Sequence, residues 1–205
     1  TPPGASLRSR VGGAVYESIL GSGPLRYRFT PRRPREVDDY PAYNLVVRSE
    51  CVRRIGGWAS TFYGGEDTRF CERLAEIGVR VHYRPDLVVY HHRRPVFRAH
   101  MRQVANVGRH RGYFARVHPA TSLRPVYFVP VTVLAMGVSA LGALTCRVGP
   151  ARSLAWSSAV YAAVGLASPA GGLGGRTLFP AALIAHHASY AIAFVHGLLT
   201  RRMDR

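Results

Sequence analysis

The sequence contains no lysine, so all 28 of its basic residues are arginine, and only 11 of its 205 residues are acidic. The absence of lysine beside abundant alanine, glycine and valine is typical of GC-rich codon usage and indicates a bacterial source. Residues 126–205 hold one acid and six arginines, whereas residues 1–125 hold ten acids and 22 arginines. A chain this basic is expected to meet anionic partners such as diphosphates, anionic lipid head groups or nucleic acid.

Cysteine is scarce as well. The three cysteines, Cys51, Cys71 and Cys146, are odd in number and widely spaced, so no disulfide framework or paired-cysteine metal site can be read from them. A reducing cytoplasm is therefore the simpler expectation. Residues 1–10 lack the apolar core of a secretory signal peptide, and we expect the chain to be cut from a longer one.

Turn-forming residues dominate the first 42 positions, which predict loop with one short helix near Val15–Leu20. Beyond them, apolar spacing predicts alternating strands and helices. The expected elements are a strand at Tyr43–Arg48, a helix capped by Ser49 that stops at Gly56-Gly57, a helix from Asp67 to Gly78 with Phe70, Leu74 and Ile77 on one face, and strands at Val79–Tyr83 and Leu87–His91. This alternation indicates a mixed α/β unit of modest size.

The second part of the chain is strongly apolar. Val126–Cys146 and Leu178–Leu199 are uncharged runs long enough to cross a bilayer, and Ser153–Ala167 is apolar but short. Arginines flank every run, so the positive-inside rule does not decide between two and three crossings; three is our prediction. His186-His187 lie near the middle of the last run, and no role is assigned to them.

A basic amphipathic segment precedes the first apolar run. Phe97, Met101 and Val104 fall on one helical face, and the nearby arginines fall largely off it. This pattern predicts a helix lying in the head-group layer of a membrane. The alternative is a surface helix packed on the soluble domain.

One combination of motifs resembles a known family. The motifs are Asn44, Arg48, Gly56-Gly57-Trp58, Gly65-Glu66-Asp67, the run from Tyr90 to Pro95, Gln103, and the run from Gly108 to Gly112. Over about residues 1–130 they resemble the acceptor-side half of bacterial family 2 glycosyltransferases, the membrane-attached inverting kind. The resemblance implies a partial GT-A type α/β domain at residues 1–95, an interfacial region at 96–124 and a helical transmembrane domain at 125–205.

The nucleotide-sugar half comes first in that family. No apolar strand ending in a DxD-type metal motif precedes residue 43 here, since Asp38-Asp39 follow a basic, proline-rich run. The resemblance therefore implies that the donor-binding half is truncated or encoded elsewhere. A divalent metal, Mg or Mn, is expected in the full-length enzyme, and no metal ligand is predicted in this chain. The catalytic portion is expected on the cytoplasmic side of a multi-pass bacterial membrane protein.

By resemblance, Asp67 is the general base of an inverting transfer, with Glu66 beside it. A position at a helix start favours the ionised carboxylate through the helix dipole, while the neighbouring Glu66 opposes it by like-charge repulsion. The alternative from the residues alone is that Asp67 is simply an N-cap and Glu66 a first-turn acid.

The resemblance also implies substrate-binding residues. They are Gly64, Gly65, His91, His92, Arg93, Gln103, Arg109, His110 and Arg111. Arginine can hold two phosphate oxygens of a departing diphosphate, which is the role implied for Arg109 and Arg111. Asn106 and Val107 stand where processive synthases carry Arg and Trp of their QxxRW motif, which argues for single sugar additions. At most one of His91 and His92 is expected to bind substrate, because adjacent strand residues face opposite sides of a sheet.

The function predicted is transfer of a sugar from a nucleotide- or lipid-diphosphate donor to a cell-envelope acceptor, by a chain that contacts membrane lipids. The alternative is a non-catalytic membrane scaffold or binding remnant of such an enzyme. A nucleic-acid-binding protein is disfavoured, because the chain carries no recognised module and has two runs that could span a bilayer. A metal transporter is disfavoured because His91, His92 and His110 lie outside those runs.

Overall fold

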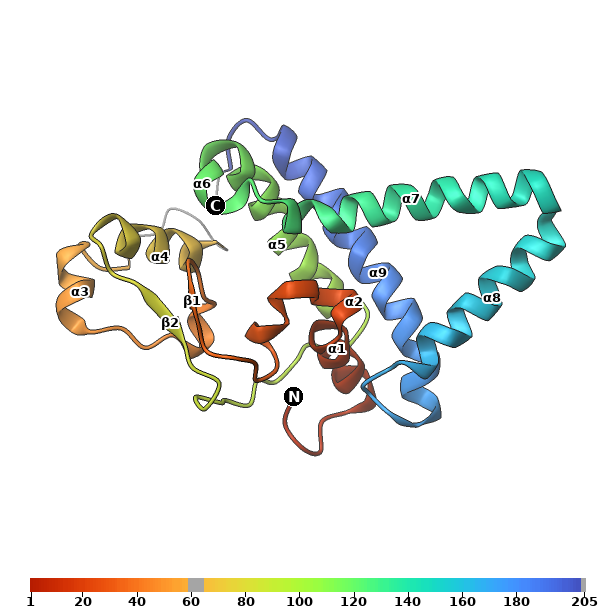
Figure 1. The fold of residues 1–205 in the computed structure, drawn as a ribbon, viewed down its shortest axis with the longest axis horizontal. Helices are drawn as coiled ribbons and strands as arrows, with labels where there is room; N and C mark the ends of the chain where they lie inside the picture. Colours follow the sequence, from red (N-terminus) through yellow and green to blue (C-terminus); the bar gives the residue numbers. More distant parts are fainter. Residues whose placement is uncertain (59–64, 204–205) are drawn as a thin grey trace.

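The computed structural model describes residues 1–58 and 65–203, and this part of the chain is mostly helical with one two-stranded sheet (Figure 1). The α-helices are α1 (Leu7–Glu17), α2 (Ile19–Ser22), α3 (Ser49–Arg54), α4 (Glu66–Glu76), α5 (Arg98–Val117), α6 (Pro119–Ser122), α7 (Pro125–Val148), α8 (Pro150–Leu166) and α9 (Gly172–Leu199). The strands are β1 (Arg35–Val37) and β2 (Val81–Tyr83), and the 3₁₀ turns are η1 (Gly23–Arg28) and η2 (Ala42–Asn44).

A small unit of α3, α4, β1 and β2 forms one end of the molecule (Figure 1). The strands pair antiparallel, with Arg35 opposite Tyr83. Helices α3 and α4 pack through Cys51, Ile55, Phe70 and Leu74, which are almost fully buried. The apolar spacing that predicted a helix from Asp67 to Gly78 is confirmed within two residues at each end, because its apolar face meets α3.

Two predicted strands are wrong. Tyr43–Arg48 begins in the 3₁₀ turn η2 and continues without regular structure, and Leu87–His91 has no assigned strand. Both segments are rich in β-branched residues, but strand formation requires a hydrogen-bonded neighbour. The described residues supply only a single bond between them, in which the Asn44 side-chain amide donates to the Leu87 carbonyl at 2.9 Å. A partial α/β domain is therefore not confirmed.

Helices α1, α5 and α9 form the central part of the molecule. Val11 and Val15 of α1 pack on Phe179 and Leu183 of α9. Helix α5 lies parallel to α9, since successive contacts join His100 to His186 and Arg116 to Thr200. The prediction of a basic amphipathic helix near residues 97–104 is confirmed as α5 (Figure 1), whose buried face meets protein.

Glycine sets the spacing of α5 and α9. A Cβ atom on Gly112 would lie 1.9 Å from the Phe194 carbonyl oxygen, and one on Gly108 would lie 2.6 Å from the Tyr190 carbonyl oxygen. On α9, a Cβ atom on Gly197 would lie 2.0 Å from the Arg109 carbonyl oxygen. The two backbones thus touch directly, as in small-residue helix pairs.

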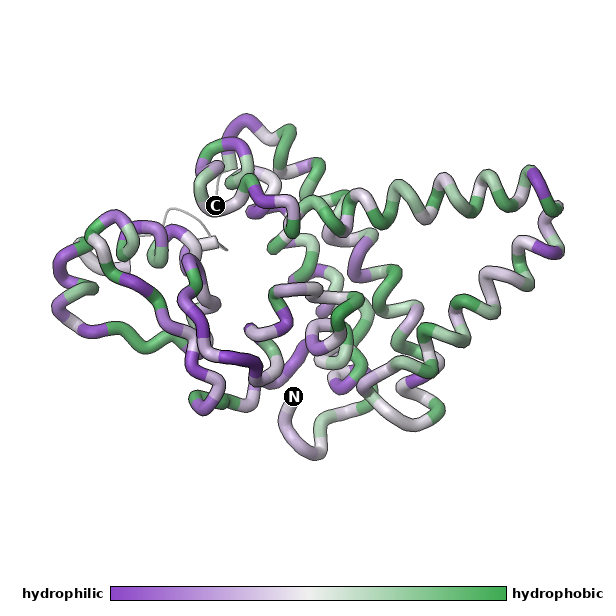
Figure 2. The backbone as a smooth tube through the Cα atoms, in the orientation of Figure 1, coloured by the Kyte–Doolittle hydropathy of each residue, from purple (hydrophilic) through white to green (hydrophobic). Residues whose placement is uncertain are grey.

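Helices α7 and α8 project away from the other elements as a hairpin (Figure 1). Two helices are long and apolar enough to cross a membrane, α7 and α9, with no part of the most apolar stretch of α7 buried and 44% of that of α9 buried. They contain the predicted runs 126–146 and 178–199. The third run forms α8, which is shorter. Figure 2 shows α7 and α8 as mainly apolar, with hydrophilic residues at the turn between them.

Candidate functional site

A buried carboxylate, Asp39, connects the small unit to α5. The Asp39 side chain is about 8% exposed and forms ion pairs with Arg28 and with Arg111, the latter at 2.6 Å. Its Oδ2 atom also accepts a hydrogen bond of 3.0 Å from the Thr68 hydroxyl. These cations and hydrogen bonds hold the pKa of Asp39 well below its usual range, so it stays ionised. The Arg111 guanidinium also stacks 4.5 Å over the Tyr127 ring.

Glu66 and Asp67 are the first two residues of α4, next to this network. The N-cap is Gly65, so the alternative that Asp67 caps the helix does not hold. Asp67 Oδ1 accepts the Thr68 backbone N–H at 2.8 Å. Burial raises the pKa of Asp67, which the Thr68 N–H and Arg111 oppose and the charges of Asp39 and Glu66 support. A carboxylate with a raised pKa in partial contact with solvent is suited to proton transfer.

Glu66 is half-buried, and its Oε2 atom has no hydrogen-bond partner among the described residues. A buried carboxylate oxygen without a partner is costly, so such an atom is a candidate to meet a ligand hydroxyl. Two cavities are described elsewhere in the molecule, and neither is lined by Glu66 or Asp67.

The two glycines predicted to bind substrate precede this pair. Gly64 lies outside the described residues. Gly65 has φ +77°, and a Cβ atom on it would lie 2.7 Å from the Phe114 ring. Only glycine suits both the left-handed backbone and this close approach. Gly65 therefore has a structural reason to be glycine, independent of any substrate.

His91, His92 and Arg93 lie in the irregular segment that follows β2. The Arg93 guanidinium lies 5.1 Å from the Phe29 ring and 5.3 Å from the Tyr16 ring, as in cation–π contacts. His91 is half-buried with its ring 5.0 Å from that of Tyr43, whereas His92 is exposed.

Tyr43 lies against this segment, with its ring 5.9 Å from the Arg93 guanidinium. Burial raises the pKa of Tyr43, Arg93 and Arg28 lower it, and the charge of Asp67 raises it. Burial, supported by Arg93, lowers the pKa of His91, and its Nδ1 atom has no hydrogen-bond partner among the described residues. Tyr43 thus lies against both His91 and Arg93, with ring and guanidinium contacts of 5.0 Å and 5.9 Å.

The predicted substrate-binding residues on α5 point in different directions. Arg111 binds Asp39, as described above, and Arg109 is exposed. His110 is buried, with Nδ1 2.7 Å from the Asn106 carbonyl oxygen. Gln103 is half-buried. Arg109 and Arg111 do not converge, so the structure offers no shared phosphate clamp from this pair, and the flanking glycines serve the contact with α9.

No group of three or more His, Cys, Asp or Glu side chains suited to a metal ion occurs in the described ranges 1–58 and 65–203. Asp39 is occupied by two arginines, and Asp38 binds Arg124 at 2.5 Å. The donors present therefore do not fit a resident divalent metal, and no chemical step is derived through one.

Sequence reasoning missed the most connected residue of the site. Asp39 gave no signal, because its partners Arg28 and Arg111 are 11 and 72 residues away. It also assigned no role to His186, whose ring nitrogen lies 3.1 Å from that of the buried His100 on α5. Both contacts join elements distant in sequence, so no local pattern marks them.

Comparison with known proteins gives one coherent result. The chain is 35% identical over 107 residues to the pre-mycofactocin glycosyltransferases of two Mycobacterium tuberculosis strains, CDC 1551 / Oshkosh and ATCC 25618 / H37Rv. The match covers 52% of this chain and 23% of each relative, so the chain spans about a quarter of their length. No family model matches, and no solved structure matches. The similarity supports a role in glycosyl transfer.

Proposed function

We propose that this chain is the acceptor-side and membrane portion of an inverting, family 2 type glycosyltransferase, with Asp67 as its general base. The observation that carries the proposal is the similarity over 107 residues to glycosyltransferases, together with the raised pKa of Asp67 at the start of α4. The acceptor is a glycan or lipid-linked molecule of the cell envelope. The chain acts at the bacterial cell membrane as a multi-pass protein, with the small unit on the cytoplasmic side.

In this mechanism Asp67 removes the proton from the acceptor hydroxyl. The hydroxyl oxygen then attacks the anomeric carbon of the donor sugar, and the diphosphate leaves from the opposite face. A partly buried base with a raised pKa is a stronger proton acceptor than an ordinary aspartate. The Thr68 backbone N–H and Arg111 partly oppose this rise in the pKa of Asp67. Glu66, whose Oε2 atom has no hydrogen-bond partner among the described residues, is suited to hold a second acceptor hydroxyl.

The exposed β-prone segments support a donor half outside these 205 residues. Val46 is 88% exposed and Tyr90 is 69% exposed, with Leu87, Val88 and Val89 between 48% and 61%. Such a continuous apolar stretch is unusual on a free surface. A neighbouring sheet from the nucleotide-binding half would cover both segments and supply their missing strand partners. The nucleotide-sugar donor, and any Mg or Mn that binds its diphosphate, would then belong to that half.

The test is Asp67→Asn in the protein that carries both halves. We expect a loss of sugar transfer of about 10²–10⁴-fold, because a general base contributes on that order, with nucleotide-sugar binding retained. Asp86→Asn is the matched control, since Asp86 is exposed and forms a surface ion pair with Arg84. Wild-type turnover in Asp67→Asn would remove Asp67 as the base.

A second experiment separates the enzyme from a non-catalytic scaffold. The 205-residue chain alone is expected to show no transfer, and addition of the nucleotide-binding half is expected to restore it. Transfer by the chain alone would contradict the proposed division of labour. Absence of transfer from the combined halves would favour a scaffold or binding role.

A further inference from the structure

Helices α7, α8 and α9 form the three sides of a triangle (Figure 1). The first turns of α7 pack against the C-terminal part of α9, where the rings of Phe128 and Phe194 lie 4.8 Å apart. The end of α8 packs against the N-terminal part of α9, where the Tyr161 hydroxyl donates to the Thr177 carbonyl at 2.6 Å. Helix α7 therefore leads away from the C-terminal part of α9, and α8 leads back to the N-terminal part of α9.

Because α5 and α9 run side by side, the side chains exposed on α5 determine whether α9 can lie inside a bilayer. Its exposed arginines follow one stripe along its length: Arg98, Arg102, Arg109 and Arg116. These positions span about 27 Å at 1.5 Å per residue, close to the thickness of a hydrocarbon core. A crossing α9 would carry this stripe through the bilayer, and each guanidinium there is costly.

The free face of α9 is nevertheless apolar. Leu173 is 81% exposed, Leu199 73%, Ile192 68% and Ile184 60%. An apolar face beside a row of arginines is the pattern of elements that lie in a membrane surface, with acyl chains below and phosphates at the flank.

The hairpin has the dimensions of a membrane insertion. Helix α7 is about 36 Å long, and α8, which is shorter at about 26 Å, has 17 residues, the lower end of the range for transmembrane helices. Arg124 precedes α7, and Arg147 and Arg152 flank the turn to α8. Charges therefore stand at both ends of the crossing and none in between.

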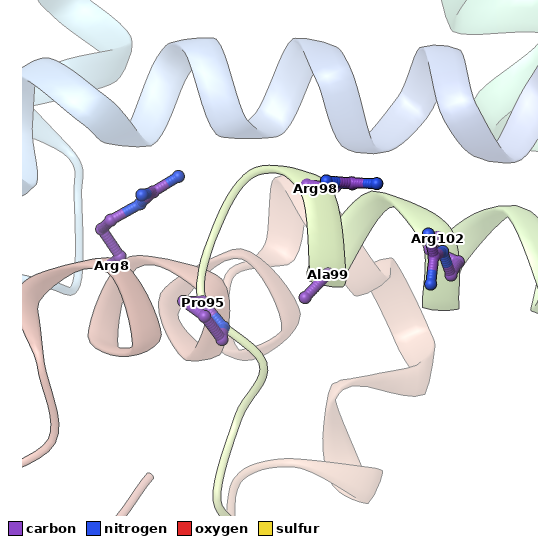
Figure 3. Close-up of a pocket in the computed structure, with 5 residues that line it drawn as sticks. All are labelled: Arg8, Pro95, Arg98, Ala99 and Arg102. Carbon is purple, nitrogen blue, oxygen red and sulfur yellow. The ribbon is translucent and has the colours of Figure 1, made fainter.

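A basic cavity lies beside α9, at the start of α5. It has a volume of about 330 Å³ and is lined by Arg8, Pro95, Arg98, Ala99 and Arg102. Figure 3 shows the side chains of Arg8 from α1 and of Arg98 and Arg102 from α5 around it. No acid lines the cavity, and Arg98 and Arg102 have no ion-pair partner among the described residues. The guanidinium groups of Arg98 and Arg102 are suited to bind a phosphate, and Arg8, whose Nε–H donates to the Val96 carbonyl, adds a third positive charge to the lining.

We propose that the α7–α8 hairpin is the part that crosses the membrane, that α9 lies with α5 in the membrane surface, and that the Arg8–Arg98–Arg102 cavity holds the phosphate head group of an anionic lipid. This arrangement differs from the crossing by residues 178–199 predicted from the sequence. It does not rest on glycosyl transfer, and its tests use no activity readout.

The topology is tested with a membrane-impermeant thiol reagent on sealed vesicles of known orientation. Cys146 at the end of α7 is exposed, whereas Cys51 and Cys71 are buried. Cys146 reports the hairpin turn, and in a Cys146→Ser background Ser49→Cys reports the small unit. Leu173→Cys and Arg201→Cys report the two ends of α9.

We expect Cys146 to react from the side opposite to Ser49→Cys, and both ends of α9 to react from the same side as Ser49→Cys. A crossing α9 gives the opposite result, with Leu173→Cys and Arg201→Cys on different sides. Reaction of all four positions from one side would also overturn the proposal, since the hairpin would then not cross.

The cavity is tested by counting phosphatidylglycerol bound to the chain in phosphatidylcholine nanodiscs. Arg98→Gln with Arg102→Gln is expected to reduce bound phosphatidylglycerol about tenfold. The matched control is Arg53→Gln with Arg54→Gln, which removes two exposed arginines of α3. Equal retention in both double variants would contradict a head-group site. Displacement of the lipid by millimolar inorganic phosphate would show a free-phosphate site instead.

Discussion

Helices α7 and α9 are similar in composition and opposite in surroundings. Both are long and apolar enough to cross a bilayer, yet the most apolar stretch of α7 touches no protein core while nearly half of that of α9 is buried. The difference lies in three glycines, Gly108 and Gly112 of α5 and Gly197 of α9, which bring the two backbones together. Hydropathy measures what a helix is made of, whereas small residues decide which protein neighbour it can accept.

The largest effect is expected for Gly112→Leu. The added side chain meets a backbone carbonyl of α9 that cannot move away alone, so α5 and α9 must separate. We expect a loss of at least about 4 kcal/mol in the free energy of unfolding, measured by denaturation in detergent micelles. Gly137→Leu on α7 is the control, because nothing lies within 4 Å of its Cβ position. A similar loss of stability in both variants would show that the close contact of α5 with α9 is not what distinguishes α9 from α7.

The next largest effect is expected for Asp39→Asn. This change leaves Arg28 and Arg111 buried without their counter-ion, which costs about 3–5 kcal/mol of stability. Asp38→Asn removes the neighbouring carboxylate, whose pair with Arg124 is solvent-exposed, and is expected to cost less than about 1 kcal/mol. Thermal unfolding of the two variants measures the difference. Equal stability would show that the network does not hold the small unit to α5.

Acid is expected to weaken the packing of α5 on α9 through His100. Burial and the charge of Arg93 lower the pKa of His100 to about 4, from about 6.5 in the unfolded chain. The unfolded state therefore binds the proton first, so stability is full above about pH 6.5 and falls as the pH drops toward 4. The loss is on the order of 3 kcal/mol.

The measurement is the pH dependence of unfolding for the wild type and for His100→Asn. The difference between the two curves reports His100 together with its contact to His186, whose pKa the charge of His100 also lowers. We expect the variant to lose less stability between pH 6.5 and 4. Parallel curves would show that His100 is not the group responsible.

The smallest effect is expected at the hairpin turn. Ser153 is buried there, and its hydroxyl lies 3.0 Å from that of Thr145 on α7. Ser153→Ala should lower the stability by about 1 kcal/mol, the usual value of one hydrogen bond. Ser157→Ala on the exposed side of α8 serves as the control. A loss at Ser157 as large as at Ser153 would indicate that α8 has protein neighbours along its length.

Local patterns predicted the helices beyond residue 48, whereas the loop with one short helix near Val15–Leu20 was wrong, because α1 and α2 form there and meet at Ser18. Phe70, Leu74 and Ile77 repeat with helical spacing, and α4 forms there because its apolar face finds α3. The uncharged run at 126–146 forms α7, as expected for an apolar run of membrane-spanning length. The strand at Val79–Tyr83 formed only as β2, since its single partner β1 is three residues long.

The parts that failed depend on distant residues. Tyr43–Arg48 and Leu87–His91 have strand composition, but the described residues provide no strand beside them. The phosphate-binding role implied for Arg109 and Arg111 stays a prediction, whereas the contact of Gly108 and Gly112 with α9 was missed, since only the position of α9 reveals it. Asp39 was passed over because neither of its arginines is near it in sequence. The site at Glu66-Asp67 therefore stays a prediction from the sequence, and the ion-pair network of Asp39 beside it was not foreseen.

Whether the α7–α8 hairpin crosses the bilayer is tested most directly with Trp156, an exposed residue near the middle of α8. Trp58→Phe leaves it as the only tryptophan, and lipids brominated at different acyl depths then report its position by fluorescence quenching. If the α7–α8 hairpin crosses the bilayer, quenching is strongest with bromine deep in the acyl chains. Strongest quenching by shallow bromine, or no quenching, would place α8 outside the hydrocarbon core and contradict the account.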